Sequence, residues 1–234
     1  MKAWELVDSA PVPNSSSIMR LMRRGHELVI HVDDRELMSN TVHGSEEALA
    51  ELTCARLNDR QRSRILIGGL GMGFTLAAAL RSLGSDAQVV VAEFVPAVVR
   101  WNWGLLGDVA GHPLIDSRVS VYEGDVDDLI RKPPALWDAI LLDVDNGPMS
   151  LARATNDQLY SSQGLDRAFS AVKPYGILSI WSAAPDKPFA RRFERAGFAV
   201  ESIDLRSRGR QGGRRHLIWL GIRKAEGPKW QRGT

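Results

Sequence analysis

Cysteine, signal-peptide features and long apolar runs are scarce or missing in this sequence. Cys54 is the only cysteine among 234 residues, so no internal disulfide can form, which is typical of a protein of the reducing cytoplasm. No apolar run approaches the length of a membrane span, and the first residues lack a hydrophobic signal core. The histidines are scattered without metal-ligand spacing. We therefore expect a cytoplasmic protein with no metal and no membrane partner.

Charge of one sign is also lacking, because the formal net charge is only +2. Basic residues nevertheless gather near the C-terminus, which is typical of a solvated loop or of an anion or RNA contact. We favour the loop and expect no nucleic-acid partner, because glycines and not aromatic residues alternate with the arginines. The residues concerned are Arg206, Arg208, Arg210, Arg214 and Arg215, with Gly209, Gly212 and Gly213 among them.

The most informative segment is the glycine-rich run I-L-I-G-G-L-G-M-G at Ile65–Gly73, which continues into the helical pattern of Phe74–Leu80. A strand, a glycine loop and a helix in this order hold a nucleotide-like ligand against the N-terminus of the helix. A second buried-strand run, Val89–Ala92, is closed by Glu93. A carboxylate at that strand end is placed to accept from both hydroxyls of a ribose.

The spacing of the glycines indicates which nucleotide to expect. A dinucleotide-binding loop has G-x-G-x-x-G/A, and here Phe74 occupies the last position, where its bulk prevents close packing of helix on strand. The pattern is instead G-x-G-x-G at Gly69, Gly71 and Gly73, which is more usual for S-adenosylmethionine (AdoMet) than for NAD. Taken alone, the motif also fits an ordinary glycine-rich turn.

Strand and helix patterns alternate from the glycine run onward, which predicts an α/β fold with a doubly wound, mostly parallel sheet. Two final strands, joined by the basic loop, add a reversed last strand to that sheet. Predicted strands are Ile65–Ile67, Val89–Ala92, Val119–Tyr122, Ala139–Leu142, Ile177–Trp181, Phe198–Leu205 and His216–Ile222. Predicted helices lie at Phe74–Leu83, Ala97–Trp101, Val126–Ile130, within Asp157–Val172 and at Phe189–Ala196, and a turn is expected at Lys173–Gly176.

The chain before the glycine run reads as a smaller unit. Residues 1–17 are polar and predict a loosely held arm, Glu27–Met38 predicts a β-hairpin, and Ser45 is the expected N-cap of a helix that runs to about Leu57. Glu46 and Glu47 then lie in the first helical turn, where the helix dipole favours acids. We expect residues 1–58 to form this N-terminal region and residues 59–234 to form the nucleoside-binding domain.

Ligands of such sheets bind beyond the C-terminal ends of the strands, and carboxylates follow several of the predicted strands. Asp125 is also placed to cap the short helix after it. Asp143 follows a fully apolar strand, and a partly buried carboxylate needs partners or a task. Trp181 is the last residue of the fifth predicted strand and is the one tryptophan we expect near the pocket. The strand-end residues are Gly69–Gly73, Glu93, Gly124, Asp125, Asp143–Asn146, Trp181 and Ser182.

Several segments in order resemble the spermidine synthase-like branch of the class I AdoMet-dependent methyltransferase superfamily. The resemblance covers residues from about 28 to 222 and rests on the glycine run, V-V-V-A-E, R-V-S-V-Y-E-G-D, W-D-A-I-L-L-D-V-D, the Leu159–Tyr160 step and A-V-K-P-Y-G-I-L. It implies that the three loop glycines approach the amino-acid or propylamine part of the ligand. It further implies that Glu93 holds the ribose, that Asp125 accepts from the adenine amino group, and that Asp143 is the proton acceptor.

This sequence departs from the polyamine-making members at the positions that bind their amines. Those members carry D-[ST]-[ST]-D-P, whereas the chain has Asn146 at the second acid and an acid at Asp145 instead. Their Tyr-His pair before the glycine strand is missing, and Gly71 stands where they usually have Asp. These departures weaken aminopropyl transfer as an interpretation and leave nucleoside binding intact.

The expected chemistry is an in-line displacement on a sulfonium carbon, for which the protein aligns the nucleophile and excludes water. Asp143 and Asp145 lie two residues apart and point the same way if the strand continues, which favours a cationic amine substrate bound with Asn146 and Trp181. The leading hypothesis is a methyltransferase that uses AdoMet. The alternatives are an aminopropyltransferase that uses decarboxylated AdoMet, and a non-catalytic nucleoside-binding or interaction domain. The resemblance also implies a homodimer.

Overall fold

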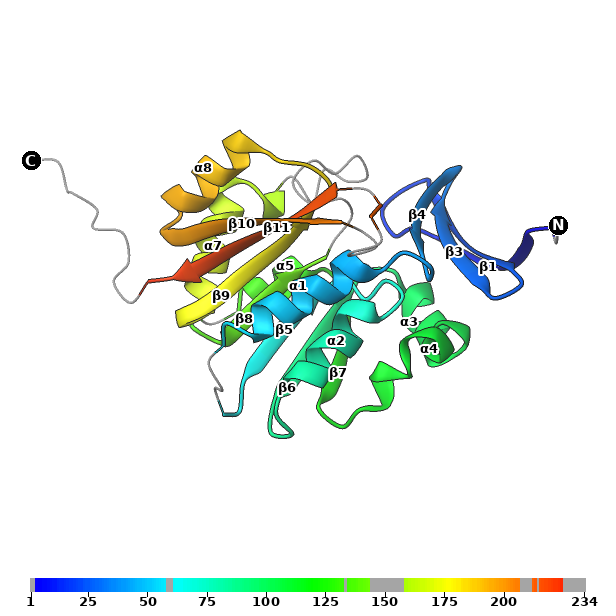
Figure 1. Ribbon diagram of the computed structural model, residues 1–234, viewed down its shortest axis with the longest axis horizontal. Helices are drawn as coiled ribbons and strands as arrows, with labels where there is room; N and C mark the ends of the chain where they lie inside the picture. Colours follow the sequence, from blue (N-terminus) through cyan, green and yellow to red (C-terminus); the bar gives the residue numbers. More distant parts are fainter. Residues whose placement is uncertain are drawn as a thin grey trace, which may run out of the picture.

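A computed structural model describes residues 3–57, 61–132, 134–143, 158–206, 212–213 and 215–224. The chain forms a large sheet with helices on both faces and a small antiparallel sheet beside it (Figure 1). No helix in the described part of the chain is long and apolar enough to cross a membrane.

The large sheet has seven strands in the order β10-β11-β9-β8-β5-β6-β7. The pairs β9-β8, β8-β5, β5-β6 and β6-β7 are parallel, and only β11 runs against the others, so the expected reversed last strand is confirmed. The strands are β5 (Arg64–Gly68), β6 (Gln88–Glu93), β7 (Val119–Glu123), β8 (Trp137–Leu142), β9 (Val172–Ser182), β10 (Phe198–Arg206) and β11 (Arg215–Arg223).

Two apolar cores lie on opposite faces of this sheet. In the central strand β5, Ile65 and Ile67 belong to one core and Leu66 to the other, as the alternation of side chains along a strand requires. This burial on both faces explains why the strand reads as a continuous apolar run. One face carries α1 (Gly44–Cys54), α2 (Phe74–Ser82), α3 (Pro96–Trp103) and α4 (Leu105–Ala110), and the other carries α5 (Val126–Ile130), α7 (Ser162–Ala171) and α8 (Lys187–Arg195).

The small sheet corrects the prediction of a loose N-terminal arm. Its strands are β1 (Glu5–Pro11), β2 (Ile18–Arg24), β3 (Glu27–Val32) and β4 (Arg35–Ser39), paired in chain order. β1 lies in the segment expected to be an arm, and it is held by backbone pairing with β2 and by a 2.7 Å hydrogen bond from Trp101 Nε1 to Asp8. Leu6 is 53% exposed, so β1 lacks the alternation that marks a half-buried strand in a sequence.

Two further local predictions are wrong. The N-cap of α1 is His43 and not Ser45, whose hydroxyl instead donates to the side chain of Glu46. The turn expected at Lys173–Gly176 is an irregular insertion inside β9, where the pairing with β8 shifts register.

α1 packs against α2 and β9, so it belongs to the layers of the large sheet. The division of the chain at residue 58 remains a prediction.

Candidate active site

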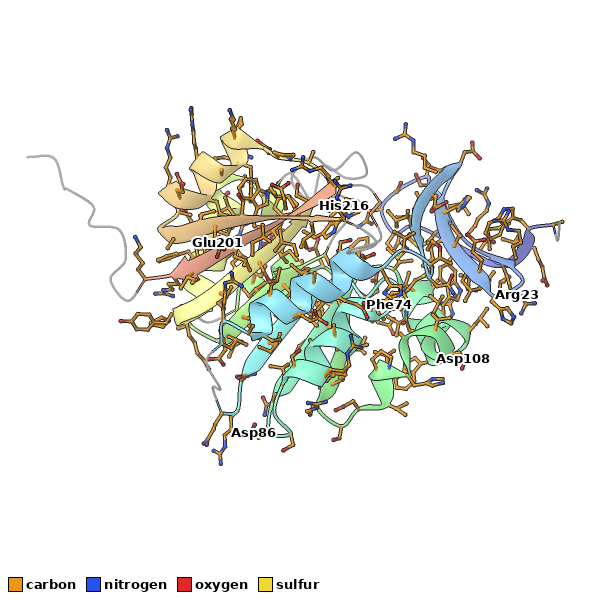
Figure 2. The ribbon with its side chains drawn as sticks, viewed as in Figure 1. Arg23, Phe74, Asp86, Asp108, Glu201 and His216 are labelled. Carbon is orange, nitrogen blue, oxygen red and sulfur yellow. The ribbon has the colours of Figure 1, made fainter. Side chains whose placement is uncertain are left out.

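The glycine loop between β5 and α2 has a backbone that only glycine adopts readily. The φ angles of Gly69, Gly71 and Gly73 are 91°, 51° and 87°, all in the left-handed region. Space is limited as well, because a Cβ on Gly73 would lie 2.9 Å from Asn102 Oδ1. Asn102 also donates to the carbonyl of Gly71 at 2.8 Å, so α3 holds the loop from the side. The loop ends at Phe74, where α2 begins (Figure 2).

Glu93 ends β6 and anchors this loop. It is 8% exposed, and its Oε2 accepts from the backbone N–H of Leu70 at 2.9 Å. Its Oε1 accepts from the backbone N–H of Val95 at 2.8 Å. The ribose-binding role of Glu93 remains a proposal.

Asp125 follows the neighbouring strand β7 and caps α5, where its Oδ1 accepts from the backbone N–H of Asp127 at 2.9 Å. The capping interpretation of Asp125 is therefore confirmed. The tips of β6 and β7 are joined by a 2.9 Å bond from Gly124 N to the carbonyl of Glu93. Asp125 thus lies beside Glu93 at the same sheet edge, and its contact with an adenine stays a proposal.

Asp143 lies immediately beyond β8, where its backbone N–H donates to the carbonyl of Gly68 at 2.9 Å. Its Oδ2 accepts from the hydroxyl of Thr75, in the first turn of α2, at 2.7 Å. The structure therefore joins the end of β8 to the start of α2 through a carboxylate. Asp145 and Asn146, the other acid and the amide expected near it, lie outside the described residues.

Glu46, on the first turn of α1, is the acid that sequence reasoning missed at this site. Burial raises the pKa of Glu46 to about 7, the neighbouring charge of Asp143 adds to this rise, and a 2.7 Å hydrogen bond from Ser45 opposes it. We refer to Glu46 and Asp143 as the acidic pair. The sequence signal was the S-E-E step before the glycine strand, which we attributed only to the helix dipole.

The acidic pair faces one cavity, which we call the acidic cavity. Of the predicted site residues, Gly71, Asp143 and Trp181 line it, whereas Gly69, Gly73, Glu93 and Asp125 do not. No lysine, arginine or histidine is among its described lining residues. That lining consists of Leu37, Met38, Ser39, Glu46, Leu70, Gly71, Met72, Phe74, Thr75, Asp143 and Trp181.

Elements far apart in sequence enclose the acidic cavity. Met38 comes from β4 of the small sheet, and its Sδ lies 3.0 Å from where a Cβ on Gly71 would be. Trp181 comes from β9 and makes an edge contact with His216 of β11, with 4.7 Å between ring centroids. The described residues contain no group of three or more His, Cys, Asp or Glu side chains arranged to hold a metal ion.

Comparisons with known proteins identify the fold. The sequence matches no protein-family model and no curated protein. A solved spermidine synthase in complex with the transition state analogue AdoDATO matches with a TM-score of 0.73 and 14% identity, over 94% of this chain and 73% of that one. Spermidine synthase from Thermotoga maritima gives 0.74 and 14%, over 94% and 74% of the chains.

A probable spermidine synthase from Corynebacterium glutamicum matches with a TM-score of 0.65 and 14% identity, over 93% of this chain and 80% of that one. The chain therefore shares the fold of these solved spermidine synthases, a mostly parallel α/β sheet with a small antiparallel sheet before it. The fold that the resemblance implied is confirmed.

Proposed function

We propose that this protein is a transferase that moves an aminopropyl group from decarboxylated AdoMet to a small amine. The observation that carries the proposal is the acidic pair, Glu46 and Asp143, facing a single cavity beside Gly71 of the glycine loop. The solved proteins that share the fold are named as spermidine synthases, which supports the same class of reaction.

Electrostatics favour the decarboxylated nucleoside over AdoMet. The side chain of AdoMet ends in an ammonium and a carboxylate, whereas the decarboxylated form keeps only the ammonium. An acidic cavity without a described cationic lining stabilises an ammonium and repels a carboxylate. If the glycine loop approaches this part of the ligand, the acidic pair selects the form without the carboxylate.

The same two acids serve the amine that is alkylated. A free alkylamine has a pKa of about 10 and is mostly protonated at neutral pH, so it binds as an ammonium and must lose a proton before it attacks. Asp143 is held by Thr75 at the edge of the cavity and is the proposed proton acceptor. Glu46 shares the charge of the bound ammonium, and Trp181 covers the cavity on the side of β9.

Methyl transfer from AdoMet is the second candidate, and a specific observation favours it. Gly71 lines the cavity where the polyamine-making enzymes usually have Asp, and Asn146 replaces their second acid. The chain therefore lacks two acids that aminopropyl transfer commonly uses, and Glu46 is the acid that would compensate for them.

Calorimetric titration with decarboxylated AdoMet, AdoMet and methylthioadenosine tests the proposal. We expect decarboxylated AdoMet to bind at least about tenfold more tightly than AdoMet, a difference of about 1.4 kcal/mol. The reverse preference would favour methyl transfer. Binding of none of the three compounds would contradict both transferase hypotheses and favour a non-catalytic domain. Mass spectrometry of a diamine incubated with each donor then identifies the transferred group.

A further inference from the structure

A chain of two hydrogen bonds leads from Glu46, one member of the acidic pair, to β11. Ser45 Oγ donates to Glu46 Oε2 at 2.7 Å and lies 3.0 Å from Nδ1 of His216. Ser45 is 1% exposed, while His216 is only partly buried. Figure 2 shows His216 at the start of β11, near the N-terminal end of α1.

We propose that His216, acting through Ser45, carries the proton released by the amine substrate from the acidic pair to solvent. This inference rests on the proposed function, because that reaction is the source of the proton. His216 and Ser45 are positioning residues, since neither lines the acidic cavity.

The reaction releases one proton for each turnover. The substrate ammonium first gives a proton to Asp143 or Glu46, and the lone pair of the nitrogen then forms the new N–C bond. The C–S bond breaks with its electron pair remaining on sulfur, which leaves as a neutral thioether. The product is again an ammonium, so one proton stays on the acidic pair and must leave before the next cycle.

The geometry gives a proton on Glu46 a route to His216. When Glu46 is protonated, its carboxyl donates to Ser45 Oγ and the Ser45 hydroxyl donates to His216 Nδ1. Moving one proton along each bond leaves Glu46 ionised and His216 charged. Imidazole is the side chain that ordinarily exchanges protons near neutral pH, and burial raises the pKa of Glu46 to about 7.

The other polar groups around Glu46 provide no equivalent route among the described residues. Thr75 donates to Asp143 and to the backbone carbonyl of Glu46, so its hydroxyl links groups at the cavity to one another. Glu47 is paired with Arg81 at 3.1 Å and with His43 at 3.3 Å. These contacts direct the side chain of Glu47 to other partners. Among the described residues, the route from Glu46 through Ser45 to His216 therefore remains as the path for the proton.

Kinetics with a diamine provide the first test. For His216→Gln and for Ser45→Ala we expect kcat to fall about tenfold or more, while the KM for the nucleoside changes less than about twofold. Imidazole buffer should restore kcat in His216→Ala, because it enters the space left by the ring. The matched control is His26→Gln, an exposed histidine on the small sheet. An unchanged kcat, or a loss without rescue together with weaker nucleoside binding, would overturn the proposal.

A second test does not need turnover. The ring titration of His216, followed by NMR in the wild type, should move to lower pH by about half a unit or more in Glu46→Gln, because a nearby negative charge is lost. Ser45→Ala should weaken this coupling. Identical titrations in all three proteins would overturn the relay. If His216 responds to the charge of Glu46 but the protein neither binds the nucleoside nor turns over a diamine, the proposed function on which the relay rests would be overturned.

Discussion

The side chain of Glu93 accepts a 2.9 Å hydrogen bond from the backbone N–H of Leu70, so the end of β6 fixes the glycine loop that follows β5. Its other oxygen fixes the start of the next segment through Val95. One buried carboxylate therefore sets the positions of two loops at the edge of the sheet where a nucleoside would bind. Loop geometry and ligand affinity should depend together on this residue.

Glu93→Gln is expected to weaken both stability and nucleoside binding. A glutamine has a single acceptor oxygen, so the N–H of Leu70 or of Val95 faces an NH₂ group and loses its partner. A buried donor left unpaired costs about 1–3 kcal/mol, which urea denaturation will measure. Calorimetry should show nucleoside affinity reduced at least about tenfold. The exposed Glu123→Gln on the neighbouring strand is the control, and a stable variant with unchanged affinity would refute the anchoring role.

Gly73→Ala is expected to destabilise the protein more than Gly25→Ala does. Both glycines have a left-handed φ, 87° for Gly73 and 66° for Gly25, so both substitutions carry the backbone cost of about 1 kcal/mol. A Cβ at Gly25 meets nothing within 4 Å, whereas one at Gly73 lies 2.9 Å from Asn102 Oδ1. The difference between the two free energies of unfolding measures the steric contacts of the added Cβ with Asn102, Ala110 and Pro113. Equal values would show that these neighbours shift without a measurable loss of stability.

The parallel core was predictable because each of its strands is marked by its own residues. Ile65–Ile67 and Ala139–Leu142 are apolar at every position, since both faces of the sheet are covered. β1 was not predictable, because Leu6 and Val7 remain 53% and 39% exposed and the strand is held by backbone pairing. Its sequence carries no periodic signal.

The candidate site was predictable only where residues lie at or just past the C-terminal ends of strands. That rule led to Gly71, Asp143 and Trp181, which line one cavity. The strand-end rule did not identify Glu46, because this residue belongs to a helix that precedes the first strand of the large sheet. The Ser45–His216 contact joins positions 171 residues apart, and only the sheet order, with β11 between β9 and β10, brings them together.

Asp143→Asn is expected to abolish most turnover while leaving nucleoside binding largely intact. The amide keeps the shape and can still accept from Thr75, but it cannot take a proton from an ammonium. Loss of a general base lowers kcat by about 10²–10⁴-fold, which a diamine assay will measure beside calorimetry with the nucleoside. Asp108→Asn, on an exposed side chain, is the control. Unchanged turnover would remove Asp143 from the mechanism.

Glu46→Gln is expected to change how stability depends on pH. Burial and the charge of Asp143 raise the pKa of Glu46 to about 7, above the ordinary value of 4.5, so the folded state binds more protons than the unfolded state between these values. By linkage, the contribution of Glu46 to the free energy of unfolding of the wild type must fall as pH rises from about 4.5 to about 7. Glutamine does not titrate, so the variant escapes that loss.

We therefore expect the difference between the free energies of unfolding of Glu46→Gln and the wild type to increase as pH rises from about 4.5 to about 7. Above about pH 7 this difference should stay constant. Urea denaturation at several pH values measures the difference, with Glu51→Gln on the exposed side of the same helix as the control. Binding of a cationic amine should show the opposite trend in the wild type, strengthening as pH rises toward 7 and Glu46 ionises. Parallel stability curves for variant and wild type would mean that Glu46 has the same pKa in the folded and unfolded states, which would refute the rise caused by burial and by Asp143.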